Sequence, residues 1–218
     1  MFLIALTSFP PRYSQLPQAL TALLDQHKSA ARILLTLPKR PARSAPAPLP
    51  NLPMGVTVIE TEDDLGPAGK LLGAARAHPD TDILICDDDW LYGPHWSACF
   101  LEAARNHPGA VIAGSTWASE RIGHQGGTVL QGFAGAFIPG TLTGQIPPPP
   151  PEAWAVDDIW ISGALQAAGA TIHPCDSARA QMSPLPSANA LQNDPTRDTQ
   201  NRAAAQAVHD RFDLWPKI

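Results

Sequence analysis

The chain has 218 residues and a formal net charge of -5. A chain of this length can bury about 70 % of its unfolded surface, so a single domain, 1–218, needs neither disulfides nor a structural metal. The acidic balance and the scattered Lys and Arg residues argue against nucleic-acid binding. Cys86, Cys99 and Cys175 are odd in number and far apart, which fits neither a zinc site nor a secreted disulfide framework, so we expect a cytoplasmic protein.

The first half of the chain alternates strand-like and helix-like segments, which is typical of a mostly parallel sheet covered by helices. Its apolar beginning is too short to cross a membrane and has no basic leader, so we interpret it as the first strand. The predicted strands are 1–6, 32–37, 56–59, 82–86 and 111–113. The predicted helices are 14–24, with Ser14 as its cap, 67–77 and 94–106, and a proline-rich loop is expected at 38–53.

After residue 115 the pattern changes. Closely spaced glycines between 123 and 138 predict a small antiparallel portion. The five prolines at 147–151 predict a stiff connection, either a plain spacer or an interaction motif. A helix from Asp157 to about Gly169 and a strand at 170–173 follow. A polar, proline-rich tail at 177–196 and a last helix at 197–212 complete an α/β pattern without internal repeats.

Three consecutive aspartates, Asp87, Asp88 and Asp89, directly follow the apolar run 82–86. The carboxyl end of a buried strand is where α/β sheets bind ligands. Adjacent carboxylates repel one another, so we expect a cation there, most simply a divalent ion shared with a phosphorylated substrate. The alternative is an acidic surface turn, but the tryptophan and tyrosine that follow favour a shaped site.

The segment 64–70 predicts a phosphate site. Gly66 and Pro67 make a tight turn into a helix whose free N–H groups and dipole favour phosphate, and Lys70 adds a cation. The segment lacks the P-loop pattern, so an ATPase is not indicated. The alternative is an ordinary helix start with a solvated lysine. Arg12, after the first strand, either guides a nucleotide or lies on the surface.

Asp157 and Asp158 open a predicted helix, where the helix dipole favours carboxylates even without a function. Trp154 could stack on a sugar ring, whereas Trp160, at helical spacing, is more typical of a core residue. His173, after the last predicted strand, is either a metal ligand or, as is commoner for a lone histidine, a structural residue.

Four segments occur in one order along the chain. They are Thr7-Ser8-Phe9-Pro10-Pro11-Arg12, Asp64-Leu65-Gly66-Pro67-Ala68-Gly69-Lys70-Leu71, Cys86-Asp87-Asp88-Asp89-Trp90-Leu91-Tyr92 and Val156-Asp157-Asp158-Ile159-Trp160-Ile161-Ser162-Gly163. Together they resemble the GT-A nucleotide-sugar glycosyltransferases, of the glycosyltransferase family 2 type, over roughly residues 1–175. The resemblance implies a GT-A-like, Rossmann-type fold with a nucleotide-binding half, 1–115, and an acceptor-side half with the C-terminal helix, 116–218.

The resemblance also implies roles for the acidic residues. It makes Asp87 and Asp89 the ligands of Mn²⁺ or Mg²⁺ on the donor's diphosphate. A strand would place both on one face, with Asp88 pointing the other way. It makes one of Asp157 and Asp158 the general base that takes the proton of the acceptor hydroxyl, and we favour Asp158. The residues we expect to bind the nucleotide are Arg12, Asp64, Lys70, Asp87 and Asp88.

We therefore expect a metal-dependent glycosyltransferase that moves a sugar from a nucleotide-diphosphate donor to a glycan or glycolipid hydroxyl, with UDP favoured by family frequency. A glycolipid acceptor would bring it to a membrane surface without a transmembrane segment. One alternative is a sugar-phosphate nucleotidyltransferase, although residues 7–12 lack the glycine- and lysine-rich signature normal for that class. The other is a non-catalytic relative that binds nucleotide sugars. The oligomeric state is not predicted.

Overall fold

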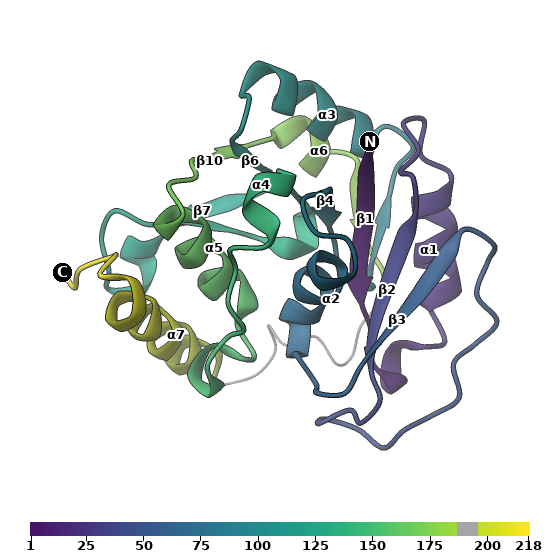
Figure 1. Ribbon diagram of the computed structural model, residues 1–218, viewed down its shortest axis with the longest axis horizontal. Helices are drawn as coiled ribbons and strands as arrows, with labels where there is room; N and C mark the ends of the chain where they lie inside the picture. The colour runs from purple at the N-terminus through teal and green to yellow at the C-terminus, as the bar shows by residue number, and fades with distance from the viewer. Residues whose placement is uncertain (187–195) are drawn as a thin grey trace.

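A computed structural model describes residues 1–186 and 196–218, and its centre is one seven-stranded sheet (Figure 1). Residues 187–195 of the predicted proline-rich tail lie outside the described residues. The strands are β1 (Phe2–Thr7), β2 (Ile33–Pro38), β3 (Val56–Thr61), β4 (Asp82–Ile85), β5 (Trp90–Tyr92), β6 (Val111–Ala113), β7 (Thr116–Ala118), β8 (Thr128–Leu130), β9 (Ala136–Ile138), β10 (Ile172–Pro174) and β11 (Met182–Pro184).

The α-helices are α1 (Leu16–Leu24), α2 (Gly69–Ala77), α3 (Trp96–Asn106), α4 (Gly140–Thr143), α5 (Asp157–Ala167), α6 (Asp176–Arg179) and α7 (Arg197–Phe212). Short 3-10 helices are η1 (Pro10–Arg12), η2 (Gly66–Ala68), η3 (Ser119–Ile122), η4 (Gly132–Ala134) and η5 (Pro151–Ala153). Within the described parts of the chain, no helix has both the length and the apolar character needed to cross a membrane.

The strand order across the sheet is β10-β6-β9-β4-β1-β2-β3. In this sheet β9 runs antiparallel to its neighbours β4 and β6, and the other paired strands are parallel. Two small antiparallel pairs, β7–β8 and β5–β11, lie outside it. The expected fold class, a mostly parallel sheet flanked by helices with an antiparallel portion after residue 115, is confirmed.

Alternation along β1 shows how the layers form. Leu3 and Ala5 belong to the core that α2, α4 and α5 cover, whereas Ile4 and Leu6 belong to the core that α1, α3 and α6 cover. A sheet buried on both faces needs apolar residues at successive positions. This requirement explains why β1 and β4 appear in the sequence as continuous apolar runs.

One local prediction was wrong, and three short elements were missed. Helix α1 begins at Leu16 with Gln15 at its N-cap, so Ser14 does not cap it. The polar, proline-rich tail contains β11 and most of α6, and neither of these elements nor β5 was predicted. Strands β5 and β11 have three residues each and pair with one another, Trp90 opposite Pro184. Such short strands are stabilised by a distant partner, which local patterns do not reveal.

The order in which strands are added to the sheet reverses at β1. Strands β2 and β3 are added on one side of β1, and β4 is then added on its other side. Open α/β sheets bind ligands outside the carboxyl ends of the strands at such a topological switch point. The loop after β1, which holds Arg12, and the loop after β4, which holds the three aspartates, both begin there.

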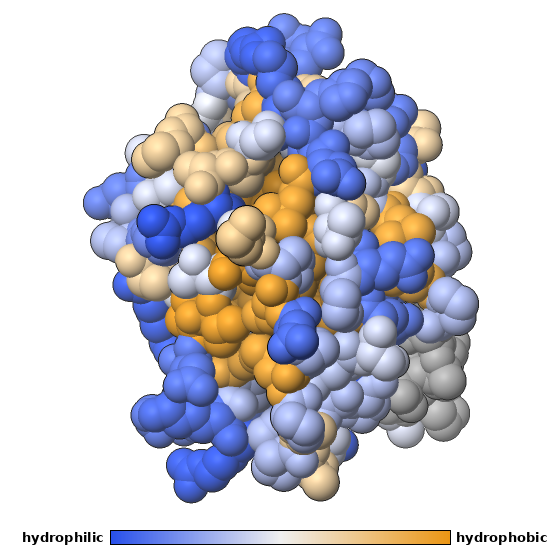
Figure 2. Space-filling model, turned by 90° about the vertical axis from the view of Figure 1, so that its right-hand side faces the viewer, coloured by the Kyte–Doolittle hydropathy of each residue, from blue (hydrophilic) through white to orange (hydrophobic). Residues whose placement is uncertain are grey.

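Strand β3 is one edge of the sheet. Its Val56 and Val58 are partly exposed, and Figure 2 shows apolar residues gathered on the side of the molecule where β3 lies. Glu60 is exposed on the same strand, and an ion pair between Lys39 and Glu62 follows the carboxyl ends of β2 and β3. Charged residues along an edge oppose pairing with another chain.

Helix α7 packs against α5, at the end of the molecule where the chain terminates (Figure 1). The two helices approach closely because residue 163 is a glycine. A Cβ atom on Gly163 would lie 2.4 Å from Cγ1 of Val208. This contact fixes α7 on the helix that carries Asp157 and Asp158.

Gly163→Ala should therefore lower the free energy of unfolding by about 1–2 kcal/mol, because the overpacking cost exceeds the gain in helix propensity. In a Val208→Ala background both Cγ contacts are gone and only the Cβ of residue 208, 3.1 Å away, stays close, so the same substitution should cost clearly less. Urea denaturation of the four proteins measures both differences. An equal cost in both backgrounds would contradict the packing argument.

Candidate functional site

A cavity of about 380 Å³ opens at the carboxyl ends of β1 and β4. Its volume lies in the range of small-molecule sites, about 300–1,000 Å³. The loops after β1, β2 and β4, η2, η4 and the starts of α5 and α7 contribute to its lining. Eight residues predicted for the site lie on it: Arg12, Asp64, Lys70, Asp87, Asp88, Asp89, Asp157 and Asp158.

Arg12 joins the loop after β1 to the loop after β4. Its Nη1 donates to Oδ1 of Asp88 at 2.6 Å, and its Nη2 lies 2.9 Å from Oδ2 of Asp89. Ser8 donates to the other oxygen of Asp88 at 2.5 Å. Burial opposes the charged form of Arg12, but Asp88 and Asp89 outweigh it and raise the Arg12 pKa. Arg12 is therefore a permanent cation, and the alternative of a surface arginine is wrong.

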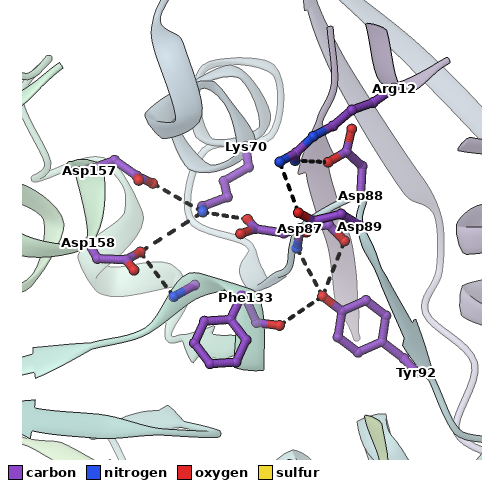
Figure 3. Close-up of polar contacts among 10 residues, drawn as sticks. Arg12, Lys70, Asp87, Asp88, Asp89, Tyr92, Phe133, Asp157 and Asp158 are labelled. Atoms are coloured by element: carbon purple, nitrogen blue, oxygen red, sulfur yellow. Dashed lines mark hydrogen bonds and ion pairs between the residues drawn. The ribbon is translucent and has the colours of Figure 1, made fainter. Parts of the chain in front are cut away.

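Lys70 joins the loop after β4 to α5 (Figure 3). Its Nζ donates to Oδ1 of Asp87 at 2.7 Å and lies 3.1 Å from Oδ2 of Asp157 and 4.0 Å from Oδ1 of Asp158. Only 1 % of Lys70 is exposed, so the alternative of a solvated lysine is wrong. Burial alone would lower the Lys70 pKa, but the three carboxylates raise it well above its usual value.

Asp158 lies between Lys70 and η4. Its Oδ1 accepts a hydrogen bond from the amide of Gly132 at 3.0 Å. A Cβ atom at Gly132 would lie 2.5 Å from Nζ of Lys70 and 2.8 Å from Oδ1 of Asp158, so a larger residue would disrupt both. Burial, followed by the charge of Asp157, raises the pKa of Asp158 to about 7. A carboxyl group with this pKa exchanges protons readily near neutral pH.

The aspartate triplet lies in a turn, because β4 ends at Ile85. The argument that a strand places Asp87 and Asp89 on one face is therefore wrong, and the two contact different cations, Lys70 and Arg12. Asp88 is the most buried of the three, held by Ser8 and Arg12. Burial and the charge of Asp87 raise the pKa of Asp89 to about 6.

The carboxylates of Asp87 and Asp89 suit a hard divalent ion such as Mg²⁺ or Mn²⁺ by their chemistry. The raised pKa of Asp89 shows that Arg12 does not fully offset burial and the neighbouring negative charge. Within residues 1–186 and 196–218, no group of three or more His, Cys, Asp and Glu side chains is arranged to hold a metal ion. Metal ligation by Asp87 and Asp89 stays a prediction.

Asp64 has a structural role on the cavity wall. Its Oδ1 accepts from the amide of Gly66 at 2.8 Å, and its Oδ2 accepts from the amide of Ala42 at 2.7 Å. Its carbonyl accepts the indole N–H of Trp154 at 2.9 Å. Asp64 thus ties the proline-rich loop to η2, and its contribution to nucleotide binding stays a prediction.

Trp160 is a core residue, whose indole N–H donates to the carbonyl of Pro147 at 2.8 Å. That bond anchors the polyproline segment, which favours its interpretation as a spacer.

The ring of His173 stacks on His107, with the ring centroids 4.1 Å apart. Neither Trp154 nor His173 is part of the cavity lining. The structure therefore does not bring His173 to the aspartates.

Tyr92 was missed as a site residue. Its buried hydroxyl accepts from the amide of Asp87 at 3.0 Å and donates to the carbonyl of Phe133 at 2.9 Å. It therefore fixes the start of the aspartate turn relative to η4 (Figure 3). Its place three residues after Asp89 was visible in the sequence, but its partner in η4 was not.

No protein-family model matches the chain, and neither does any curated protein sequence. Among solved structures the chain is similar to 2-C-methyl-D-erythritol 4-phosphate cytidylyltransferase from Thermus thermophilus. The identity is 18 %, the match covers 94 % of this chain and 98 % of that chain, and the TM-score is 0.45. A likeness at this level carries no argument about activity. The functional assignment therefore rests on the geometry of the cavity.

Replacing Lys70 with Met should lower the free energy of unfolding at pH 8 by about 3–5 kcal/mol, because it leaves buried carboxylates without their cation. Lys39→Met is the matched control, since Lys39 pairs with Glu62 on the surface and its loss should change stability little. Chemical denaturation compares the two variants. Equal, small effects would show that the buried ion pairs do not stabilise the fold.

Asp158→Asn should change the pH dependence of stability. The folded-state pKa of about 7 lies above the value of an unfolded aspartate, about 3.9. The wild type therefore loses stability as pH rises from about 4 through about 7, and the variant lacks this loss. The melting temperature of the variant minus that of the wild type should increase between pH 5 and pH 8. A constant difference would contradict the raised pKa.

Proposed function

We propose that this protein is a metal-dependent glycosyltransferase that moves a sugar from a nucleotide-diphosphate donor, with UDP favoured, to a hydroxyl of a glycan or glycolipid. One observation carries the proposal. The acids after β4 and the acids at the start of α5 meet across Lys70 at the switch point of the sheet. The acids after β4 suit a cation bound to the donor's diphosphate. The acids at the start of α5 suit the removal of the proton from the acceptor hydroxyl.

The donor side of the cavity combines aromatic and cationic groups. The guanidinium carbon of Arg43 lies 4.5 Å from the ring centroid of Phe9, and both residues line the cavity. Arg43 forms no ion pair with a described carboxylate, and a guanidinium group matches phosphate in geometry. A divalent ion held by Asp87 and Asp89 would neutralise charge on the leaving nucleoside diphosphate.

The acceptor side contains the base. The oxygen of the acceptor hydroxyl bonds to the donor sugar's anomeric carbon, and the bond from that carbon to the diphosphate oxygen breaks. The electron pair leaves with the nucleoside diphosphate, and the hydroxyl proton passes to Asp158. Lys70 holds Asp158 and Asp87 in position. Three carboxylates already surround the ammonium group of Lys70. The structure therefore gives no direct support for a contact between Lys70 and phosphate, and that contact stays a prediction.

The two halves of the chain divide these tasks in the proposal. Residues 1–115 supply the donor side, and residues 116–218 supply the acceptor side. Arg197, Asp198 and Asn201 at the start of α7 line the cavity, which supports including the C-terminal helix in the acceptor half. The single-domain organisation and the cytoplasmic location remain expectations from the sequence.

The test is a panel of nucleotide sugars incubated with the protein and Mn²⁺, with water as a slow acceptor and release of free UDP as the readout. Asp158→Asn should reduce turnover by about 10²–10⁴. Donor affinity should stay nearly unchanged, and a donor at ~100 times its Kd should still stabilise the folded variant by about 2.7 kcal/mol. Excess chelator should abolish turnover in the wild type.

Asp157→Asn is the matched control. If Asp157→Asn carries the loss of turnover instead, Asp157 is the base and the mechanism stands. Release of pyrophosphate from a nucleoside triphosphate and a sugar phosphate would make the protein a nucleotidyltransferase. Tight binding of a nucleotide sugar without any turnover would make it a binding protein.

A further inference from the structure

Side chains from three other elements hold the backbone of η4, the short turn at one wall of the cavity. Asp158 accepts from its first amide at 3.0 Å, and Tyr92 donates to its second carbonyl at 2.9 Å. Trp96 donates to its third carbonyl at 3.2 Å. Figure 3 shows the first two contacts converging on the turn. These hydrogen bonds to backbone groups fix the position of η4 relative to the acids.

This fixed turn presents an aromatic ring to the cavity. The ring of Phe133 stacks on that of Trp90, with centroids 4.9 Å apart and planes inclined by 27°. Both rings line the cavity and both are partly exposed. The guanidinium carbon of Arg179 lies 5.1 Å from the Trp90 ring centroid and 5.3 Å from that of Phe133, so it braces the stacked pair. The result is a braced aromatic surface in a cavity that also holds the acidic residues.

The position of the stack relative to the base decides which substrate can use it. A general base acts on a hydroxyl within hydrogen-bond reach. Asp158 is bonded to the residue directly before Phe133. A molecule that offers a hydroxyl to Asp158 therefore lies beside the Trp90–Phe133 stack. Phe9, the aromatic residue of the donor side, comes from the loop after β1 and contacts the guanidinium groups of Arg12 and Arg43.

We propose that the Trp90–Phe133 stack is the acceptor subsite and that it binds a pyranose ring. The apolar C–H face of the sugar packs on the aromatic surface, and a ring hydroxyl points to Asp158. An open-chain polyol lacks the apolar face. This inference rests on the proposed function, because the acceptor side is defined by Asp158 as the base.

The test uses the full chain labelled with ¹⁵N, in which each of the six tryptophans contributes one indole N–H signal to an NMR spectrum. The Trp90 signal is identified as the one missing from Trp90→Phe. The probes are the methyl pyranosides of glucose, galactose, mannose and N-acetylglucosamine. At least one should shift the Trp90 signal, and sorbitol should not. Phe133→Leu should weaken the apparent affinity about five-fold or more. Phe9→Leu, in the loop after β1, should leave this affinity unchanged.

Uridine shifting the Trp90 signal where no pyranoside does would overturn the proposal and make the stack a nucleobase site. No shift with any of the four pyranosides would also overturn it. Hydrolysis of a nucleotide sugar, measured separately, distinguishes the two proposals. If the protein hydrolyses a nucleotide sugar but no pyranoside binds at Trp90, the subsite proposal fails and the transferase proposal stands. Pyranoside binding at Trp90 without binding or hydrolysis of any nucleotide sugar supports a carbohydrate site and rejects the transferase.

Discussion

The buried ammonium group of Lys70 is the interaction on which the rest of this site depends. An isolated charge in that position would be too costly to bury, and three nearby carboxylates make it stable as a cation. The dependence is mutual, because Asp87, Asp157 and Asp158 could not approach one another without it. Helix α2 thereby joins the carboxyl end of the sheet to α5. The glycine at 132 provides the space that this arrangement needs.

A second cation separates the acids into two chemically different groups. Arg12 engages Asp88 and Asp89, while Lys70 engages Asp87 and the pair on α5. The raised pKa values of Asp89 and Asp158, about 6 and about 7, therefore arise in different surroundings. Two carboxyl groups that lie beside different cations can serve as a cation ligand and as a proton acceptor in one cavity. The distinction between donor side and acceptor side in our proposal follows from this separation.

The sequence predicted which residues gather but not which of them touch. The carboxyl ends of parallel strands share one edge of a sheet, so residues after β1 and β4 were expected to meet. Their pairing depends on contacts such as that of Arg12 with Asp88, 76 positions apart, which periodicity cannot reveal. The strand-face argument for Asp87 and Asp89 failed because a turn replaces the strand after Ile85. The stack of Trp90 and Phe133 was invisible because neither residue lies in a periodic segment.

Because of the close contacts at Gly132, this position should tolerate substitution much less than the next one, Phe133. Any side chain there would enter the space of the Lys70 ammonium and the Asp158 carboxylate. The next residue, Phe133, lines the cavity, and the hydrogen bonds from Asp158, Tyr92 and Trp96 that hold its turn go to backbone groups. A variant library built to alter acceptor choice should therefore keep the glycine constant and diversify the phenylalanine.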